Sequence, residues 1–421
     1  MNVLVFAFRL LYLTQKNPFD YQFSDPARHW LNGERFFHPD LMGASDPILY
    51  QFYIWILHSL SFDNRLIVGL LTGLFSALMP WTFYRAAREF GMHKVPALVL
   101  FLLIAITPSL FTIYHYFMME TLLLPLLGMA LWMTARHLRK KSLSSFATAV
   151  MFWMLACLTK ATVVPLAALC LAWIWWESPR KLATAFTAIG IAAILLLPNS
   201  IRTYAQLGFV ASFGNPWLTK IQHRSGARKI EIAFKGGEWG FVSPSCVIYP
   251  LAPLSKWTMR RALEDSTVKV DVDVKAGERD WKDSYQRLDV GWREWMSQWG
   301  ENIVLFLFAP SWPDCNTNEW DGWLTVMSRW MWAPIIFFVL DCNIRDFYKR
   351  RFDLLPVATT VFTLFLMFQN VATSEGRYRK PLEPLLLMNL VWAITPRPKN
   401  AEESSSQFLM SHARNFTPRQ I

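Results

Sequence analysis

The stretch RLIVGLLTGLFSALMPWTFY, residues 65–84, carries only one charged side chain, that of Arg65 at its start. About twenty apolar residues in a helix match the thickness of a bilayer core. Further apolar runs, several of them shorter, lie at 1–15, 95–113, 120–135, 144–159, 161–177, 182–200, 322–341, 353–372 and 381–396. The sequence therefore predicts an all-α polytopic membrane protein with about ten transmembrane helices.

The overall composition favours a membrane protein over a soluble one. Apolar residues make up 53% of the chain and charged residues 17%, and the mean hydropathy is +0.22. The 21 tryptophans suit a protein with many membrane–water interfaces, where the indole ring is buried and its N–H stays hydrated. We attribute the net charge of +11 to cytoplasmic loops that face anionic membrane lipid, and we expect no nucleic-acid partner.

Basic residues between the apolar runs predict the orientation. They form four clusters: Arg85, Arg88 and Lys94; Arg136, Arg139, Lys140 and Lys141; Arg180 and Lys181; and Arg345, Lys349, Arg350 and Arg351. With ten spans and a cytoplasmic N-terminus, all four clusters lie on the cytoplasmic side, as the positive-inside rule requires. An eleventh span at 48–60 would break this agreement, so we expect that aromatic run to lie on the outer membrane surface.

This topology divides the chain into four parts. They are an N-terminal transmembrane module, 1–200, with the first outer loop, 16–64; a mixed outer loop domain, 201–321; a C-terminal transmembrane module, 322–396; and a disordered cytoplasmic tail, 397–421. Residues 292–308 predict an amphipathic surface helix, with a re-entrant helix as the alternative. Cys246 and Cys315 fall outside, where a disulfide and two free thiols both remain open. No cysteine pair has metal-ligand spacing, so no metal site is predicted, and a divalent cation is left open without a ligand set.

The first outer loop holds the strongest candidate for a catalytic base. Ser24 is a good helix N-cap and Pro26 a good first-turn residue, so a short helix is expected from here to about Arg35. Asp25 then lies at a helix N-terminus, which favours its ionised form, and an ionised carboxylate can take a proton from an acceptor hydroxyl or amine. Asp20 is the competing candidate. The plain alternative is that Asp25 only caps the turn.

The motif SDPARHW, residues 24–30, with Gly33 closing the helix, resembles the GT-C superfamily of membrane glycosyltransferases. That superfamily includes protein O-mannosyltransferases and the lipid A aminoarabinose transferase. The resemblance implies a GT-C-like fold, in which an aspartate after the first span is the catalytic base or positions the acceptor. Many members carry an Asp-Glu pair at this place, whereas this chain has Asp-Pro. Here the resemblance points to Asp25, with His29 as a sugar or acceptor contact.

A second similarity lies in HYFMME, residues 115–120, before the fourth predicted span. The family often has a glutamate at the outer start of this span, which implies a catalytic or positioning role for Glu120. Helix electrostatics alone also favour a glutamate at this N-terminus. His115 would face the same outer cavity and bind sugar or phosphate, although a lone interfacial histidine is more often structural.

The third similarity is the most specific. The stretch EGRYRKPLEP, residues 375–384, resembles the Arg-Tyr-Arg-x-Pro-x-x-Pro signature near the C-terminus of many bacterial GT-C proteins. Paired arginines can bind a lipid phosphate bidentately, which implies this role for Arg377 and Arg379, with Glu375 and Tyr378 as sugar or acceptor contacts. Arginines that anchor the helix at the headgroups are the alternative.

Two more basic residues join this expected phosphate site. Lys160 lies in a tight outer turn where family members often have Lys or Arg, and Arg202 follows the seventh span. Each alone is readily explained as a side chain that reaches the headgroups. With Arg377 and Arg379 they would form a cationic outer pocket.

The resemblance implies an enzyme that transfers a sugar from a polyprenyl-phosphate-linked donor to an acceptor lipid, glycan or protein at the outer face. We expect the bacterial inner membrane, with the active site facing the periplasm. One alternative is an O-antigen polymerase or ligase that uses His223, Arg224 and Arg228 of the large loop. A transporter is a second alternative, which predicts charged residues or broken helices at mid-span. The predicted spans carry almost no charge at their centres, with Arg9 the main exception, which disfavours transport. A non-catalytic membrane assembly protein is the third.

Overall fold

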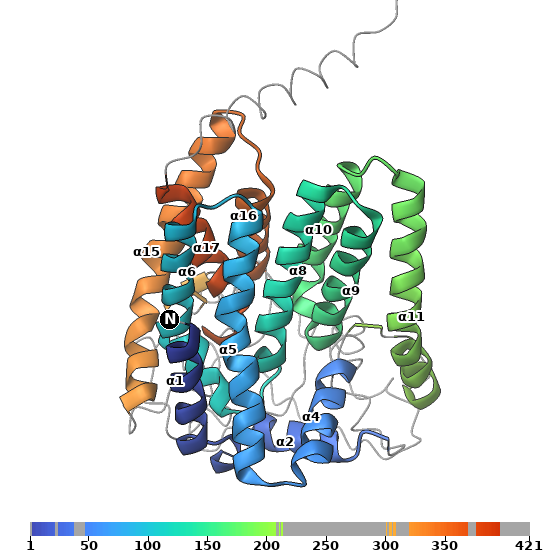
Figure 1. The fold of residues 1–421 in the computed structure, drawn as a ribbon, viewed down its shortest axis with the longest axis vertical. Coiled ribbons are helices and arrows are strands. Elements are labelled where there is room, and N and C mark those ends of the chain that lie inside the picture. Colours follow the sequence, from blue (N-terminus) through green and yellow to red (C-terminus); the bar gives the residue numbers. More distant parts are fainter. Residues whose placement is uncertain are drawn as a thin grey trace, which may run out of the picture.

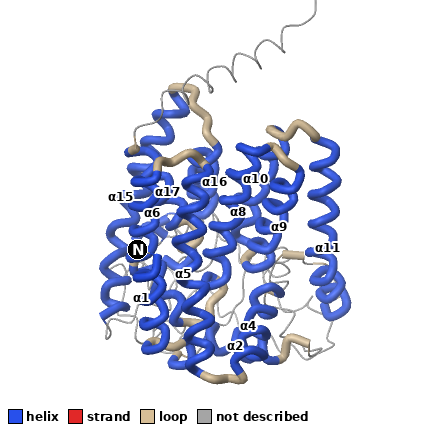
Figure 2. The backbone as a smooth tube through the Cα atoms, in the orientation of Figure 1, coloured by secondary structure: helices blue, strands red, loops and turns tan. Residues whose placement is uncertain are grey.

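The computed structural model describes residues 2–21, 24–37, 47–207, 320–368 and 376–395. Between residues 207 and 320 it also describes positions 210, 212–213, 300, 303–304 and 306–308. Figure 2 shows helices joined by loops, and this part of the chain contains no strand. The all-α fold is thereby confirmed. The predictions for Cys246, Cys315, most of 201–321 and the tail 397–421 lie outside the described residues.

Among the described residues, four helices are long and apolar enough to cross a membrane. They are α5 (Arg65–Glu89), α8 (Glu120–Lys140), α11 (Lys181–Leu207) and α15 (Trp320–Tyr348). A fifth candidate combines α6 (Lys94–Ile106) with α7 (Pro108–Phe111) and η2 (Thr112–His115), which meet at a bend of 75°. Apolar helices of this length indicate an integral membrane protein. The count of about ten spans stays a prediction.

The other predicted spans are helical but shorter. They are α1 (Asn2–Gln15), α9 (Leu143–Thr159), α10 (Val164–Trp176), α16 (Leu354–Phe368) and α17 (Glu383–Ile394). At 1.5 Å per residue, α17 covers about 18 Å and α9 about 26 Å, less than a bilayer core of about 30 Å. The turns that follow or precede such short helices therefore lie within the depth of the bundle.

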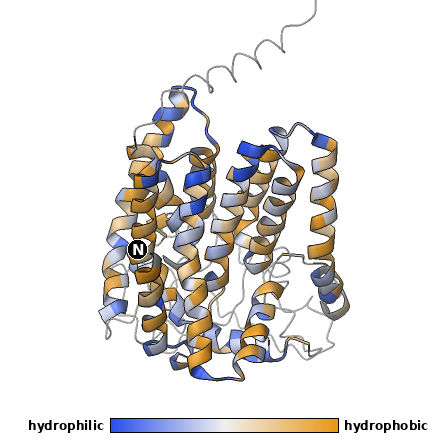
Figure 3. Ribbon diagram, in the orientation of Figure 1, coloured by the Kyte–Doolittle hydropathy of each residue, from blue (hydrophilic) through white to orange (hydrophobic). Residues whose placement is uncertain are grey.

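The two ends of the bundle differ in character. Figure 1 shows α2 (Ser24–Glu34) and α4 (Ile48–Ser61) at one end, which we call the α2/α4 end. The loops that carry the four basic clusters lie at the opposite end (Figure 1), as predicted. Hydrophobic residues cover the length of α11 between the two ends (Figure 3), and most of this helix is exposed in the isolated chain, as expected of a surface that faces lipid.

Close packing of α1 on α5 depends on two glycines spaced four residues apart. A Cβ at Gly69 would lie 2.7 Å from the Leu13 carbonyl oxygen, and one at Gly73 would lie 2.7 Å from Leu10 Cδ2. Small residues at this spacing let two membrane helices approach until their backbones touch. The pair fixes α1, and the loop that follows it, against the long span α5.

The bend between α6 and α7 explains the mid-span Arg9. Proline cannot donate a backbone hydrogen bond, so Pro108 interrupts the helix and exposes carbonyl groups. Arg9 donates to the carbonyl oxygen of Ala105 at 2.8 Å, to that of Leu110 at 3.4 Å and to Ser76 Oγ at 3.0 Å. This buried arginine therefore stabilises a broken helix, a feature that the transporter alternative also predicts.

Helices form at both places in the first predicted outer loop where the sequence predicted them, and their position on the membrane surface stays a prediction. Helix α2 starts at Ser24 and ends at Glu34, and α4 covers the aromatic run beginning at Ile48. Gly33 allows their contact, since a Cβ there would lie 2.5 Å from Ile54 Cβ. His58 of α4 reaches the Trp30 carbonyl oxygen at 3.1 Å through Nε2. The second half of α2 thus rests on α4.

Candidate functional site

Asp25 lies in the first turn of α2, as predicted. Its carboxylate accepts a hydrogen bond from Arg28 Nη1 at 2.6 Å, one turn along the same helix. The Asp25 side chain is 18% exposed and that of Arg28 is 37% exposed. The helix N-terminus and the guanidinium both favour the ionised carboxylate, and its partial exposure leaves it within reach of a second molecule.

Asp20, the competing candidate, accepts hydrogen bonds from a backbone N–H and from an arginine side chain. It ends the short helix η1 (Pro18–Asp20), where it accepts from the Asn17 backbone N–H at 3.1 Å in a capping box. Both carboxylate oxygens also accept from the guanidinium of Arg65, at 2.7 Å for Nη2. This arrangement fixes the loop to the start of α5.

Glu120 and Lys160 form a buried ion pair. Glu120 opens α8, Lys160 follows the last residue of α9, and Lys160 Nζ lies 2.5 Å from Glu120 Oε1. The Glu120 side chain is fully buried and that of Lys160 is 8% exposed. Lys160 Nζ also lies 5.4 Å from the centre of the Tyr378 ring. The structure thus brings together three predicted site residues from separate parts of the sequence.

His115 lies in an aromatic cluster at the end of η2. Its ring is 4.3 Å from that of Tyr21, 6.2 Å from that of Tyr12 and 4.9 Å from that of Tyr116, between ring centres. The buried Nε2 atom has no hydrogen-bond partner among the described residues. Tyr12 donates its hydroxyl to Asp321 Oδ2 at 2.6 Å. The predicted role of His115 toward sugar or phosphate stays a prediction.

Asp321 is a buried carboxylate that the sequence analysis missed. It lies at the start of α15, with Lys16 Nζ 3.8 Å from Oδ1. Burial raises the pKa of Tyr21, and the negative charges of Asp321 and Asp20 raise it further. Glu120 was singled out by the family resemblance, and no such motif covers Asp321, although both are acidic residues in the first turn of a helix.

Arg379 is buried at the end of η4 (Gly376–Arg379) and makes several hydrogen bonds. It donates through Nε to Glu383 Oε1 at 3.1 Å, and through Nη1 to the carbonyl oxygens of Phe306 and of Leu307, the latter at 3.1 Å. Burial lowers the pKa of Arg379, and the charge of Glu383 opposes this shift. Arg379 therefore joins the start of α17 to the segment at 306–307.

Neighbouring residues extend this network. Ser109 donates to Glu383 Oε2 at 2.6 Å, and Lys380 Nζ donates to the Ser109 carbonyl oxygen at 2.6 Å. Glu383, Lys380 and Ser109 were not predicted as site residues, although two of them lie in the quoted motif. The side chain of Arg377 and all of Glu375 fall outside the described residues.

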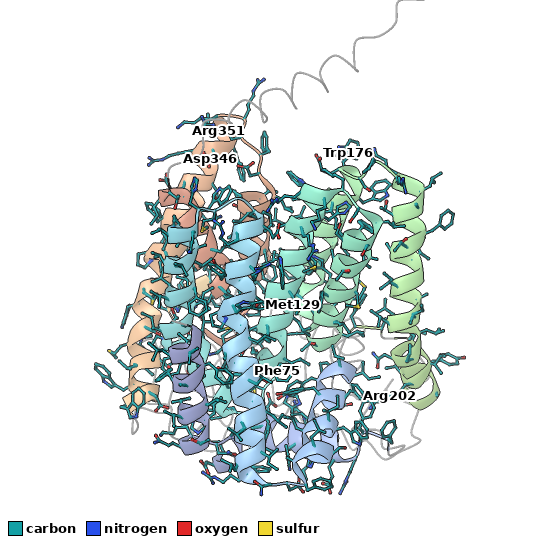
Figure 4. All side chains as sticks on the ribbon, in the orientation of Figure 1. Phe75, Met129, Trp176, Arg202, Asp346 and Arg351 are labelled. Carbon is teal, nitrogen blue, oxygen red and sulfur yellow. The ribbon has the colours of Figure 1, made fainter. Side chains whose placement is uncertain are left out.

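Arg202 and His29 belong to a separate group near α4. Arg202 lies at the α2/α4 end (Figure 4), where it donates to Gln51 Oε1 at 3.1 Å. The buried His29 ring packs edge-on against Tyr50, at 5.0 Å between ring centres. Gln51 and Tyr50 are neighbours on α4, so this helix links two predicted residues that lie 173 positions apart, at 29 and 202.

The described residues hold no group of three or more His, Cys, Asp or Glu side chains that fits a metal ion. The predicted residues instead gather in three places: Asp25 with Arg28, Glu120 with Lys160 and Tyr378, and Arg202 with the α2–α4 pair. Carboxylates beside cations within a helical membrane bundle and at its α2/α4 end define a class of site suited to proton transfer and to binding an anionic headgroup.

Comparison with known proteins specifies this class. Residues 45–201 match the family described as dolichyl-phosphate-mannose-protein mannosyltransferase, which belongs to the GT-C superfamily. The match runs from the start of α4 into α11 and includes Glu120 and Lys160; Asp25 and Arg379 lie outside it. It confirms the resemblance to GT-C proteins over this part of the chain and supports a glycosyltransferase of the GT-C type. No curated protein matches the chain.

Proposed function

We propose that the protein transfers a sugar from a polyprenyl-phosphate donor to an acceptor lipid, glycan or protein. The observation that carries this proposal is the family match over 45–201, a region whose two polar helix ends form the Glu120–Lys160 pair. A lysine held by one buried carboxylate keeps its position and its remaining N–H donors for a further anion. We place the site at the α2/α4 end and this end on the periplasmic side of a bacterial inner membrane.

Asp25 is the proposed base. The acceptor hydroxyl or amine gives its proton to the Asp25 carboxylate as its oxygen or nitrogen bonds to the anomeric carbon. The bond between that carbon and the phosphate oxygen breaks, and polyprenyl phosphate leaves with the electron pair. A single displacement inverts the anomeric carbon. Arg28 keeps Asp25 ionised before the acceptor arrives.

The leaving phosphate requires positive charge. We propose Lys160, Arg377 and Arg202 as phosphate-binding residues because cations placed at developing charge stabilise the transition state. Arg379 already donates to Glu383 and to two carbonyl oxygens, so it holds the η4 turn beside the phosphate as well as contributing its charge. His29, His115, Glu375 and Tyr378 remain proposed sugar or acceptor contacts. No divalent cation is needed in this scheme.

The test is a transfer assay with the purified full-length protein in lipid vesicles. Polyprenyl-phosphate donors with different radiolabelled sugars are offered together with membrane extracts as the acceptor source. We expect wild type to transfer label from one donor class, and Asp25→Asn and Arg377→Ala to lose transfer while they remain folded. Full transfer by Asp25→Asn would move the base to Asp20 or Glu120. Absence of wild-type transfer from every donor and extract would contradict the proposal.

A further inference from the structure

Arg329 lies within α15, nine residues from its first residue, Trp320. At 1.5 Å per residue this is about 14 Å along the helix from the α2/α4 end. Arg329 is buried, with 4% of the residue exposed. Its Nε and Nη1 atoms are buried and have no hydrogen-bond partner in the part of the chain that the structure describes, and none of the ion pairs there involves it.

The other buried basic residues of the bundle contrast with Arg329. Arg9 donates to backbone carbonyl groups, Lys160 pairs with Glu120 and Arg379 pairs with Glu383. An isolated buried cation is costly in a protein interior and more so in a membrane, where ionisable residues normally pair. Arg329 makes one contact that suits a cation, with its guanidinium carbon 4.9 Å from the Trp330 ring centre. This contact supplies no hydrogen-bond acceptor, so the guanidinium is poised for an anion.

The position of Arg329 connects it with the proposed donor site. Asp321, Thr325 and Arg329 follow one another at four-residue spacing, so they share one face of α15. Thr325 Oγ1 lies 3.1 Å from Thr112 Oγ1 in η2, which directs this face toward the interior. One turn beyond Arg329, the Trp332 ring lies 5.8 Å from the Arg379 guanidinium. Arg329 is thus one helical turn from the η4 motif.

The same arginine also borders the surface that faces lipid. The Trp330 ring, over which the Arg329 guanidinium lies, belongs to a residue that is 48% exposed in the isolated chain. The centre of this ring lies 5.8 Å from that of the Phe308 ring. An anion that reaches Arg329 from this side arrives through hydrocarbon and must therefore be attached to an apolar chain. A lipid that carries a phosphate has this combination of properties.

We infer that Arg329 binds the phosphate of a lipid phosphate, and that this lipid is the polyprenyl donor or its polyprenyl-phosphate product. The identity of the lipid rests on the proposed function. A guanidinium presents two parallel N–H donors to two phosphate oxygens, a geometry that lysine cannot reproduce. Arg329 is therefore a further donor-binding residue, in a span where the sequence analysis recorded no mid-span charge.

Binding is measured with the purified full-length protein in neutral-lipid nanodiscs, by titration with polyprenyl phosphate, with the uncharged polyprenol and with phosphatidylglycerol. The variants are Arg329→Gln and Arg329→Lys. Arg345→Gln is the matched control, because Arg345 is an exposed arginine of the same helix that pairs with Asp341. We expect Arg329→Gln to weaken polyprenyl phosphate binding about ten- to a hundred-fold, the loss that follows from removing a charge-assisted hydrogen bond. Arg329→Lys should recover part of it, and Arg345→Gln should bind as wild type does.

Equal weakening toward phosphatidylglycerol would keep the lipid-phosphate site and assign it to bulk phospholipid. Unchanged binding by Arg329→Gln, or equal wild-type affinity for polyprenol, would overturn the inference. Without lipid phosphate, the thermal midpoint of Arg329→Gln should equal or exceed that of wild type, since an unpaired buried charge is removed. A lower midpoint that Arg329→Lys restores would instead show a structural role. These readouts need no transfer activity, so failure of the transfer assay with binding intact would refute the proposed function alone.

Discussion

Asp25 and Glu120 are both acidic residues at a helix start, yet their surroundings differ. Asp25 is partly exposed and its partner Arg28 is more exposed still, whereas Glu120 and its partner Lys160 are buried. A base must be reached by its acceptor and must exchange its proton with solvent. A buried carboxylate paired with lysine meets neither need and instead fixes the position of the cation. On this comparison we propose that Asp25 acts as the base and that Glu120 positions Lys160.

The largest expected effect is on stability, at the buried pair. Glu120→Ala leaves Lys160 buried without its carboxylate, which should cost about 3–5 kcal/mol of unfolding free energy. The double variant Glu120→Gln with Lys160→Met should recover most of this loss, because no unpaired charge remains. Reversible unfolding in mixed detergent micelles gives both values. The single variants Glu120→Gln and Lys160→Met complete the cycle, and if their separate effects simply add up in the double variant, the two residues do not depend on each other.

A smaller effect is expected where α2 rests on α4. Gly33→Ala places a Cβ against Ile54, so α2 must shift, at a cost of about 1–3 kcal/mol. Because Asp25 lies on α2, the loss of transfer rate, expressed as a free energy, should exceed the loss of unfolding free energy. Gly190→Ala is the control, since a Cβ there has no neighbour within 4 Å and the residue is helical. Equal transfer rates in the two variants would show that the α2–α4 contact at Gly33 does not position Asp25.

The smallest effect is expected at Asp20. The pair with Arg65 is largely exposed, so Asp20→Asn should lower the unfolding free energy by about 0.2–1 kcal/mol and should leave transfer near the wild-type rate. Arg65→Gln should behave in the same way, because it removes the same pair. A strong loss of transfer in Asp20→Asn, with none in Arg65→Gln, would make Asp20 the base.

Local signals predicted the helix from Ser24, the surface helix from Ile48 and the turn at Lys160, because caps, prolines and apolar runs act within a few residues. The Glu120–Lys160 pair was not predicted. It depends on how α8 and α9 lie against each other, and the two residues had been given separate roles. Single-residue rules also gave no reason to notice Arg329, since what distinguishes it is that its buried Nε and Nη1 have no partner among the described residues.

The most direct measurement of the central claim is the single-turnover rate of sugar transfer by Asp25→Asn beside that of Glu120→Gln, at saturating donor. The account predicts that Asp25→Asn loses about a hundred- to ten-thousand-fold in rate with an unchanged thermal midpoint, as expected for removal of a general base. Glu120→Gln should lower the midpoint and weaken donor binding, with a smaller loss of rate. An Asp25→Asn rate near that of wild type, together with an inactive but folded Glu120→Gln, would contradict it.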